Sequence, residues 1–323
     1  MTSQSVAIST RFRETLKKVP GLRFAKRKAW DFIGWAVRNT VERKYHRTIE
    51  SLPIFTPVSA GSARDRARLT VFAANQVLPL LSSLIDQTRT DRLSATIRAE
   101  SLCTEAGSID AADKLAFLFR KHGSDKAGTH NYQHIYGSIL RNPASVTSVL
   151  EIGLGTNYSD IVSSMGPGGK PGASLRAFRD FLPNARIYGA DIDARILFEE
   201  ERISTFFVDQ TDAESLENLG AKVGGNCDLI VDDGLHAPNA NISVLVFALN
   251  RLKPGGWLVI EDVSRSAYPV WKVVAALLPK EYKPYMIEGT VHMVFAVQRL
   301  GQPGSNPDTP ATTRAETPTC QTR

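Results

Sequence analysis

The apolar positions of the second half of the chain alternate between short runs and helical spacing. Short runs rich in Val, Ile and Leu occur at residues 149–152, 185–191, 203–208, 228–231 and 257–260. Helical patterns are expected at 174–181, 240–252 and 270–278, and a hairpin at 282–287 with 291–298. Short apolar runs separated by helices are typical of buried parallel strands. The pattern predicts an α/β fold with a Rossmann-like, seven-stranded, mostly parallel sheet and helices on both faces.

The first third of the chain is helical in pattern and lacks strand signals. Trp30, Ile33, Val37 and Val41 fall on one face of a helix expected at 22–47, and a second helix is expected at 67–102, where Pro79 kinks or divides it. Residues 51–66 are expected to form a linker, and a capped helix to cover 113–121. The predicted domains are a basic arm at 1–20, a helical extension at 21–110, the α/β domain at 111–300 and a disordered tail at 301–323.

The positive charge lies in the N-terminal part. Residues 1–50 hold twelve Lys and Arg against four Asp and Glu, a net charge of +8. Because the whole chain has a net charge of +6, the remaining residues sum to about −2. This distribution argues against a nucleic-acid groove across the α/β domain. The basic helix is either a membrane-surface helix or an accessory helix packed on its own domain or on a second copy, and the accessory interpretation is favoured. A homo-oligomer remains open.

Cysteine usage and hydropathy indicate a cytoplasmic protein. Cys103, Cys227 and Cys320 are far apart, with neither zinc spacing nor a disulfide framework. No run reaches the ~18 apolar residues of a spanning helix, and the N-terminus has no apolar core of a secretory signal.

A glycine-rich turn follows the first predicted strand. Glu151, Gly153 and Gly155 form the turn, where the glycines allow a close approach of the backbone to a ligand. A third glycine typical of dinucleotide binding is absent, because Tyr158 stands there, so a cofactor without phosphates fits better. Such a string also arises by chance in strand–turn units.

Polar side chains end each of the following strands as well. Asp191 ends the second strand and suits the two hydroxyls of a ribose. Asp209 and Gln210 end the third, and Asp232 ends the fourth. Because the carboxyl ends of parallel strands meet at one edge, these residues are candidates for cofactor binding. A single strand-end Asp is also a common helix cap or turn former.

A group of four acids indicates a metal. Asp232, Asp233, Glu261 and Asp262 lie at the ends of neighbouring strands, where unpaired carboxylates would repel, and oxygen ligands favour a hard ion such as Mg²⁺. Asp233, Glu261 and Asp262 are the candidate ligands that the family resemblance described below implies. His236 follows Asp233 closely and is the candidate general base for a substrate hydroxyl, whose pKa the metal would lower. His130, His134 and His292 have no comparable company. The polar loop at 123–132 is either a lid over the cofactor or an ordinary capped turn.

The motifs together resemble the class I S-adenosylmethionine-dependent methyltransferases, and among them the metal-dependent sugar O-methyltransferases of macrolide biosynthesis. The likeness covers about residues 113–300. It is carried by Gly123-Ser-Asp-Lys with His130 and Tyr132, Glu-Ile-Gly-Leu-Gly at 151–155, Gly172-Ala-Ser-Leu, Tyr188-Gly-Ala-Asp191, Asp209-Gln-Thr-Asp212, Asp232-Asp-Gly-Leu-His236, and Pro254-Gly-Gly with Ile260-Glu-Asp262.

The resemblance implies an S-adenosylmethionine-dependent O-methyltransferase acting on a sugar or glycosylated small molecule. It implies that Ser124 and Lys126 lie in a loop covering the cofactor and that His236 is the base. The glycine-rich insertion at 165–172 and the first ~110 residues depart from the family, so the acceptor is not identified. The alternatives are a metal-independent methyltransferase of the same fold and a non-catalytic cofactor-binding scaffold.

Overall fold

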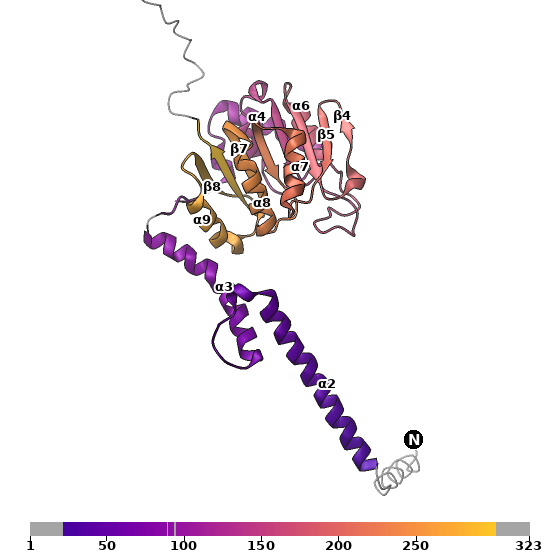
Figure 1. The fold of residues 1–323 in the computed structure, drawn as a ribbon. Helices are drawn as coiled ribbons and strands as arrows, with labels where there is room; N and C mark the ends of the chain where they lie inside the picture. Colours follow the sequence, from indigo (N-terminus) through magenta and orange to yellow (C-terminus); the bar gives the residue numbers. More distant parts are fainter. Residues whose placement is uncertain (1–21, 89, 94, 302–323) are drawn as a thin grey trace, which may run out of the picture. The chain divides into compact units, whose positions relative to one another are not determined.

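A computed structural model describes residues 22–88, 90–93 and 95–301, and residues outside these ranges are drawn in grey in Figure 1. The expected basic arm at 1–20 and the expected tail at 301–323, apart from residue 301, lie outside the described residues. The chain divides into two compact units between Leu81 and Ser82. Each unit is described by itself.

In the first unit, the described residues from 22 onward form two helices and a short turn. Helix α2 spans Leu22–Ser51, the 3-10 turn η1 spans Pro53–Phe55, and α3 spans Ala63–Thr88 and passes the boundary between the units. Ser62 starts α3, because its Oγ accepts a hydrogen bond of 3.1 Å from the amide of Asp65. The hydroxyl of the buried Thr70 in α3 lies 3.0 Å from that of Thr56, which joins α3 to the turn.

Helix α3 is continuous, and it is more apolar than we expected. Pro79 lies inside the helix without dividing it. By length and composition alone α3 is able to cross a membrane, with an 18-residue window of mean hydropathy 1.3. The expectation that no segment meets this criterion is therefore wrong, although a single such helix is weak evidence for a membrane span.

The second unit is built around a nine-stranded sheet in the order β1-β8-β9-β7-β6-β2-β3-β5-β4. Five of the neighbouring pairs are parallel, and the pairs β4–β5, β7–β9 and β8–β9 are antiparallel. The strands are β1 (Thr96–Arg98), β2 (Ser148–Ile152), β3 (Arg186–Asp191), β4 (Glu199–Glu200), β5 (Ile203–Phe207), β6 (Cys227–Asp232), β7 (Leu252–Val263), β8 (Tyr282–Glu288) and β9 (Met293–Arg299).

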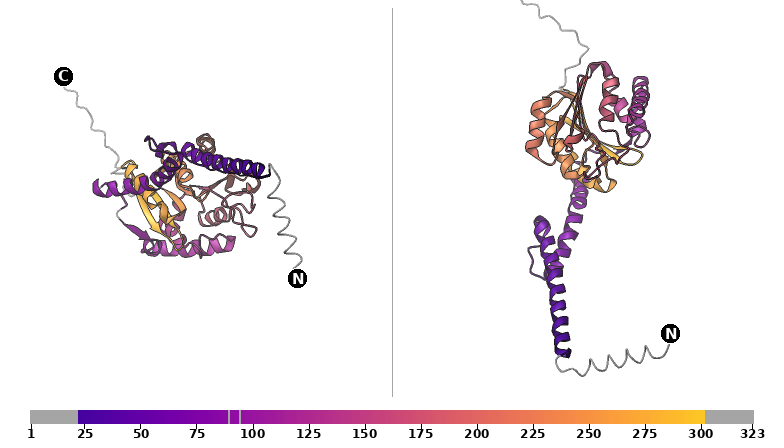
Figure 2. Two further views of the ribbon diagram at one scale, coloured as in Figure 1. Left: turned by 90° about the horizontal axis from the view of Figure 1, so that it is seen from below. Right: turned by 90° about the vertical axis from the view of Figure 1, so that its right-hand side faces the viewer.

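Helices cover both faces of this sheet, as Figure 2 shows. One face packs on α4 (Ala106–His122), α5 (Gln133–Ile139) and α6 (Ala173–Phe181), and the other packs on α7 (Ala213–Val223), α8 (Pro238–Leu249) and α9 (Tyr268–Leu277). Side chains of a strand alternate between the faces, so Val149 belongs to the first core and its neighbour Leu150 to the second. Short 3-10 turns complete the unit at η2 (Ala99–Leu102), η3 (Pro143–Ser145), η4 (Ala194–Ile196) and η5 (Arg265–Ala267).

The predicted Rossmann-like sheet is confirmed, with two more strands than expected. The helix expected at 67–102 ends at Thr88, and the strand β1 and the turn η2 follow it. β1 pairs in parallel with β8, so residues 96–98 extend the sheet at its edge. The two-residue strand β4 extends the opposite edge. The segment at 82–110, which we expected in the helical extension, is thus part of the sheet unit.

Candidate functional site

The carboxyl ends of β2, β3, β6 and β7 meet at one edge of the sheet. Ile152 pairs with Asp232, which in turn pairs with Ile260, so β2 and β6 end level with Ile260 of β7. Asp191 ends β3 beside them. The residues that follow, Gly153, Asp233 and Glu261 among them, are therefore brought to one rim, as the sequence pattern predicted.

A pocket opens at this rim. Of the nine candidate cofactor-binding residues, Gly153, Gly155, Asp191, Asp209 and Gln210 line it. The other lining residues are Ile152, Thr156, Ile161, Val162, Ser163, Ile192, Val208, Thr211, Asp233, Gly234 and Leu235. Apolar walls with a few polar groups are typical of small-molecule sites.

Glycine is required where β2 turns into the pocket. Gly153 has a φ of +94°, and a Cβ atom there would lie 2.1 Å from the carbonyl oxygen of Asp233. Gly155 has a φ of +75°, and its Cβ would meet the Met165 side chain at 2.3 Å. The backbone of this turn thus passes close against the strand-end loop that follows β6, and only glycine fits.

Asp191 is a fixed acceptor on the pocket wall. Its Oδ2 accepts a hydrogen bond of 2.7 Å from the amide of Leu154, and its Oδ1 accepts one of 2.8 Å from the amide of Asp193. Burial raises the pKa of this carboxyl, while the backbone donors act against that effect. A carboxylate has further lone pairs, so Asp191 still has acceptor capacity for a ligand.

Asp232 lies behind the pocket and orients a residue that lines it. The buried carboxylate accepts from Nε2 of Gln210 at 3.1 Å and from Nδ2 of Asn241 at 2.9 Å. Gln210 in turn accepts a hydrogen bond of 2.7 Å from the amide of Leu235. Burial raises the pKa of Asp232.

The loop that follows the glycine turn is fixed to the end of β3. The hydroxyl of Thr156 donates to Oδ2 of Asp193 at 2.6 Å. Arg195 forms an ion pair with Asp160 at 3.0 Å, and its guanidinium lies 3.9 Å from the ring centre of Tyr158. The insertion that we expected to lengthen this loop therefore begins from an ordered segment beside the pocket.

Three residues at the same rim have the arrangement of a cation site. Asp233, His236 and Asp262 each offer one ligand atom, and these atoms lie within 4.8 Å of one another. Nε2 of His236 is 3.9 Å from Oδ1 of Asp233 and 3.9 Å from Oδ2 of Asp262. His236 and Asp262 have φ values of 54° and 53°, a left-handed conformation that non-glycine residues adopt at a cost and that is enriched at functional sites.

Glu261, the third predicted metal ligand, lies beside this group with both oxygens engaged. Its Oε2 is 2.5 Å from Nζ of Lys126, and its Oε1 accepts a hydrogen bond from the hydroxyl of Tyr136. Both Glu261 and Tyr136 are buried, and burial raises the pKa of this carboxyl well above its usual range. The Asp233–His236–Asp262 group thus forms without Glu261.

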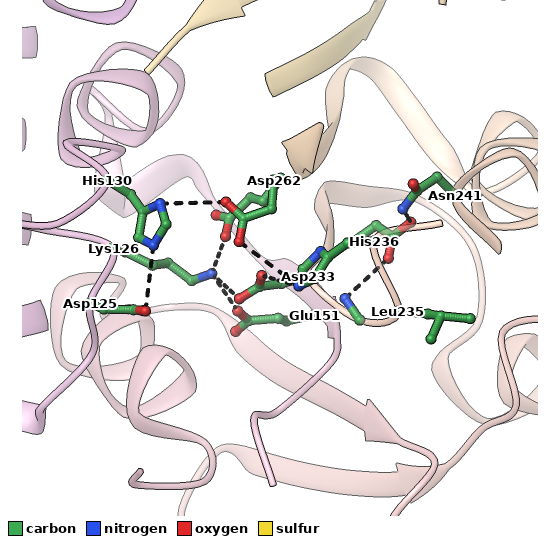
Figure 3. Close-up of polar contacts among 12 residues, drawn as sticks. Asp125, Lys126, His130, Glu151, Asp233, Leu235, His236, Asn241 and Asp262 are labelled. Carbon is green, nitrogen blue, oxygen red and sulfur yellow. Dashed lines mark hydrogen bonds and ion pairs between the residues drawn. The ribbon is translucent and has the colours of Figure 1, made fainter. Parts of the chain in front are cut away.

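Lys126 and Glu151 complete a buried network next to the pocket, drawn in Figure 3. Nζ of Lys126 also lies 2.7 Å from Oδ2 of Asp233 and 3.1 Å from Oε1 of Glu151. The other oxygen of Glu151 accepts a hydrogen bond of 2.6 Å from Ser174. Glu151 and Lys126 were expected around a cofactor, and the structure places them below the rim rather than on the pocket wall. Ser124 is half-buried in the same loop, and its Oγ accepts from the amide of Lys126.

His130 and Tyr132 of the polar loop contact the cation group, a connection that the sequence did not predict. Nδ1 of His130 is 3.4 Å from Oδ1 of Asp262, and Nε2 is 3.6 Å from Asp125. The interaction of the His130 imidazole with the Asp125 carboxylate raises the pKa of His130, while burial acts against it. The hydroxyl of Tyr132 donates to Oδ1 of Asp262 at 2.6 Å. The expectation that His130 has no acidic company is wrong, because the loop folds back onto the end of β7.

Comparison with known proteins confirms the predicted resemblance. The chain is 34% identical over 161 residues to the 8-demethyl-8-alpha-L-rhamnosyl tetracenomycin-C 2'-O-methyltransferase of Streptomyces olivaceus, covering 49% of this chain and 40% of that protein. It is 39% identical over 99 residues to the mycinamicin VI 2''-O-methyltransferase of Micromonospora griseorubida, and this match covers 30% of this chain and 24% of that protein. The chain thus spans less than half the length of these relatives. No family model matches.

Solved structures include a methyltransferase of the same group. The MycE methyltransferase from the mycinamycin pathway, in complex with Mg, SAH and mycinamycin VI, is 26% identical with a TM-score of 0.45, covering 58% of this chain and 53% of that one. Since this superposition is weak, the inferences about the site depend on the residues of the present structure and on the sequence relatives.

Proposed function

We propose that the sheet unit is an S-adenosylmethionine-dependent O-methyltransferase that acts on a sugar hydroxyl of a glycosylated small molecule. The observation that carries the proposal is the double position of Asp233, which lines the pocket and also belongs to the cation group. A methyl donor in the pocket and an acceptor hydroxyl at the cation group would therefore meet at one residue. The two sequence relatives are named as O-methyltransferases of a rhamnosyl tetracenomycin and of mycinamicin VI.

The pocket has groups suited to the donor. Asp191 supplies acceptors for the ribose hydroxyls, and Asp209 and Gln210 supply polar groups farther along the wall. Gly153 lines the pocket, and its lack of a side chain lets the turn pass against the carbonyl group of Asp233. The absence of a third glycine in this turn agrees with a donor that has no phosphates.

The donor set also suits magnesium. Asp233 and Asp262 supply carboxylate oxygens, which a hard divalent ion prefers, and Nδ1 of His236 is a buried polar atom without a hydrogen-bond partner. Asp233 and Asp262 would hold the ion, with Glu261 behind them. Bound there, magnesium would lower the pKa of the acceptor hydroxyl and orient it.

His236 would accept the proton during methyl transfer. The acceptor oxygen bonds to the methyl carbon, the carbon–sulfur bond breaks, and its electron pair stays on sulfur, which gives S-adenosylhomocysteine. The hydroxyl proton passes to an imidazole nitrogen of His236, a contribution of typically 10²–10⁴-fold for general bases. Holding donor and acceptor in line supplies a further part of the acceleration.

The test combines binding and turnover. Isothermal titration calorimetry measures S-adenosylmethionine affinity, and transfer of a labelled methyl group is followed over a panel of rhamnosylated and other glycosylated acceptors. Glu261→Ala should abolish transfer and leave donor affinity largely intact, because Glu261 does not line the pocket. Asp233→Ala should also abolish transfer, whereas Asp110→Ala, an exposed acid of α4, should change neither transfer nor donor affinity. Donor binding without transfer over the whole panel would favour the cofactor-binding scaffold, and full transfer in EDTA would favour a metal-independent enzyme.

We also propose that the first unit serves a partner rather than the chemistry. Its exposed large apolar side chains on α3 include Leu69, Phe72 and Leu80, and basic residues precede them at Arg64 and Arg66. This composition suits either a second copy of the chain or an anionic lipid surface. Flotation of the full chain with anionic vesicles, together with its oligomeric state in solution, separates the two. A variant with Leu69, Phe72 and Leu80 replaced by Ser should lose whichever of these interactions the intact chain shows. A cytoplasmic location remains a prediction.

A further inference from the structure

Lys126 is a buried cation shared by three carboxylates from three strand ends. Its Nζ lies 2.5 Å from Glu261, 2.7 Å from Asp233 and 3.1 Å from Glu151, and only 2% of its side chain is exposed. Three carboxylates within ion-pair distance of one ammonium make Lys126 the positive centre of this acidic group.

The ammonium and the cation group share one carboxylate. Oδ2 of Asp233 binds Lys126, while Oδ1 of the same residue faces His236 in the cation group. Glu261, adjacent in sequence to Asp262, is held by the same ammonium. Lys126 thus neutralises part of the negative charge that would otherwise attract a bound cation (Figure 3).

We propose that Lys126 is an internal counter-ion that keeps the acidic rim assembled in the absence of metal and, by competing for Asp233 and Glu261, holds divalent-ion binding weak. The inference rests on the proposed metal site and adds the residue that sets its affinity. The Lys126 ammonium and a divalent cation bound a few ångströms away would repel each other strongly in a poorly solvated site. Removing the ammonium should therefore strengthen metal binding. The same removal leaves buried carboxylates without a partner, which destabilises the metal-free protein.

Two neutral variants and one charged variant test the proposal. Lys126→Met removes the charge and the donors, Lys126→Gln keeps amide donors without the charge, and Lys126→Arg keeps the charge. Lys114→Met, which removes an exposed lysine of α4, is the matched control. Calorimetry with Mg²⁺ alone, and paramagnetic titration with Mn²⁺ alone, give the metal affinity, and thermal unfolding with and without Mg²⁺ gives the stability.

We expect both neutral variants to bind Mn²⁺ about tenfold more tightly or better than the unaltered protein. Their metal-free melting temperature should fall, and the increase on adding Mg²⁺ should be larger than in the unaltered protein. Lys126→Arg and Lys114→Met should retain the original metal affinity. If Lys126→Met does not fold, Lys126→Gln carries the same comparison.

Unchanged or weaker metal binding in the folded neutral variants would overturn the proposal, as would the absence of any binding in both neutral variants. These outcomes are distinct from failure of the methyltransferase assignment, because they are measured without donor or acceptor. If the unaltered protein binds no divalent ion but the neutral variants do, the counter-ion role holds and the magnesium step of the proposed function fails.

Discussion

The hydroxyl of Tyr132 donates a hydrogen bond of 2.6 Å to Oδ1 of Asp262, across 130 residues of sequence. Oδ2 of the same carboxylate faces His236 in the cation group. Tyr132 is buried, and burial with the nearby carboxylates raises its pKa, so the phenol stays protonated and donates to the Asp262 carboxylate. The tyrosine thereby fixes the orientation of a candidate metal ligand.

Tyr132→Phe should loosen this ligand without removing it. Outer partners of metal ligands typically contribute 10–100-fold to metal affinity or activity, so we expect Mg²⁺ affinity to fall about tenfold. Donor affinity should remain, since Tyr132 does not line the pocket. Calorimetry with each ligand measures both quantities, and Tyr285→Phe in β8 is the control. Equal loss of donor and metal affinity would contradict the assignment.

Gly153→Ala should damage the donor pocket and the fold together. The new Cβ would lie 2.1 Å from the carbonyl oxygen of Asp233, a backbone atom that cannot turn away, and the φ of +94° is strained for alanine. We expect a loss of more than about 1 kcal/mol in unfolding free energy and a large loss of S-adenosylhomocysteine affinity. Denaturant unfolding and calorimetry measure these effects.

The control for this substitution is Gly168→Ala in the insertion. A Cβ at Gly168 would meet nothing within 4 Å, and this residue has no left-handed φ. The control should keep both the stability and the donor affinity. Normal donor binding by Gly153→Ala would remove the turn from the proposed site.

Most of the sheet could be predicted because each central strand carries its own local signal. β2 is rich in β-branched and aliphatic residues and is followed by glycine, and the apolar runs of β3 and β6 end at Asp191 and Asp232. β1 could not be predicted, because three residues carry no periodicity and their partner is β8, almost two hundred residues later. Its existence depends on an available sheet edge rather than on its sequence.

The site residues likewise include some that could be predicted from local sequence and some that could not. Asp191, Asp233 and Asp262 could be predicted as neighbours because parallel strands end at a common edge. The sequence could not place Lys126 or His130 against them, because their loop reaches the rim by tertiary packing of α4 and α5. The one available signal was the density of polar donors at 123–132 directly before the aromatic Tyr132 and Tyr136.

Chelation and a His236 variant should show whether His236 acts as the general base or as a metal ligand. EDTA should stop methyl transfer, and added Mg²⁺ should restore it. If His236 is the base, His236→Gln should lower the turnover number by about 10²-fold or more and change Mg²⁺ affinity only a few-fold. A large loss of Mg²⁺ affinity in this variant would instead identify a metal ligand, and His46→Gln in α2 serves as the control.

Asp180 should make the stability of the sheet unit sensitive to acid. Its Oδ2 accepts from Nε2 of His122 at 2.8 Å and from Lys121 at 3.2 Å, which joins α6 to the end of α4, and Oδ1 accepts from Arg179. Burial would raise the pKa of Asp180, but the hydrogen bonds from His122, Arg179 and Lys121 outweigh it and lower the pKa well below 3.8.

Because the pKa is depressed in the folded state, this stabilisation is complete above the unfolded value and is lost as the pH falls below about 4. Asp180→Asn should therefore lower the unfolding free energy by about 1 kcal/mol at pH 7. The difference from the unaltered protein should shrink between pH 4 and pH 2.5. Denaturant unfolding over this range measures it, with Asp110→Asn as an exposed control, and a difference that stays constant down to pH 2.5 would contradict the assigned contacts.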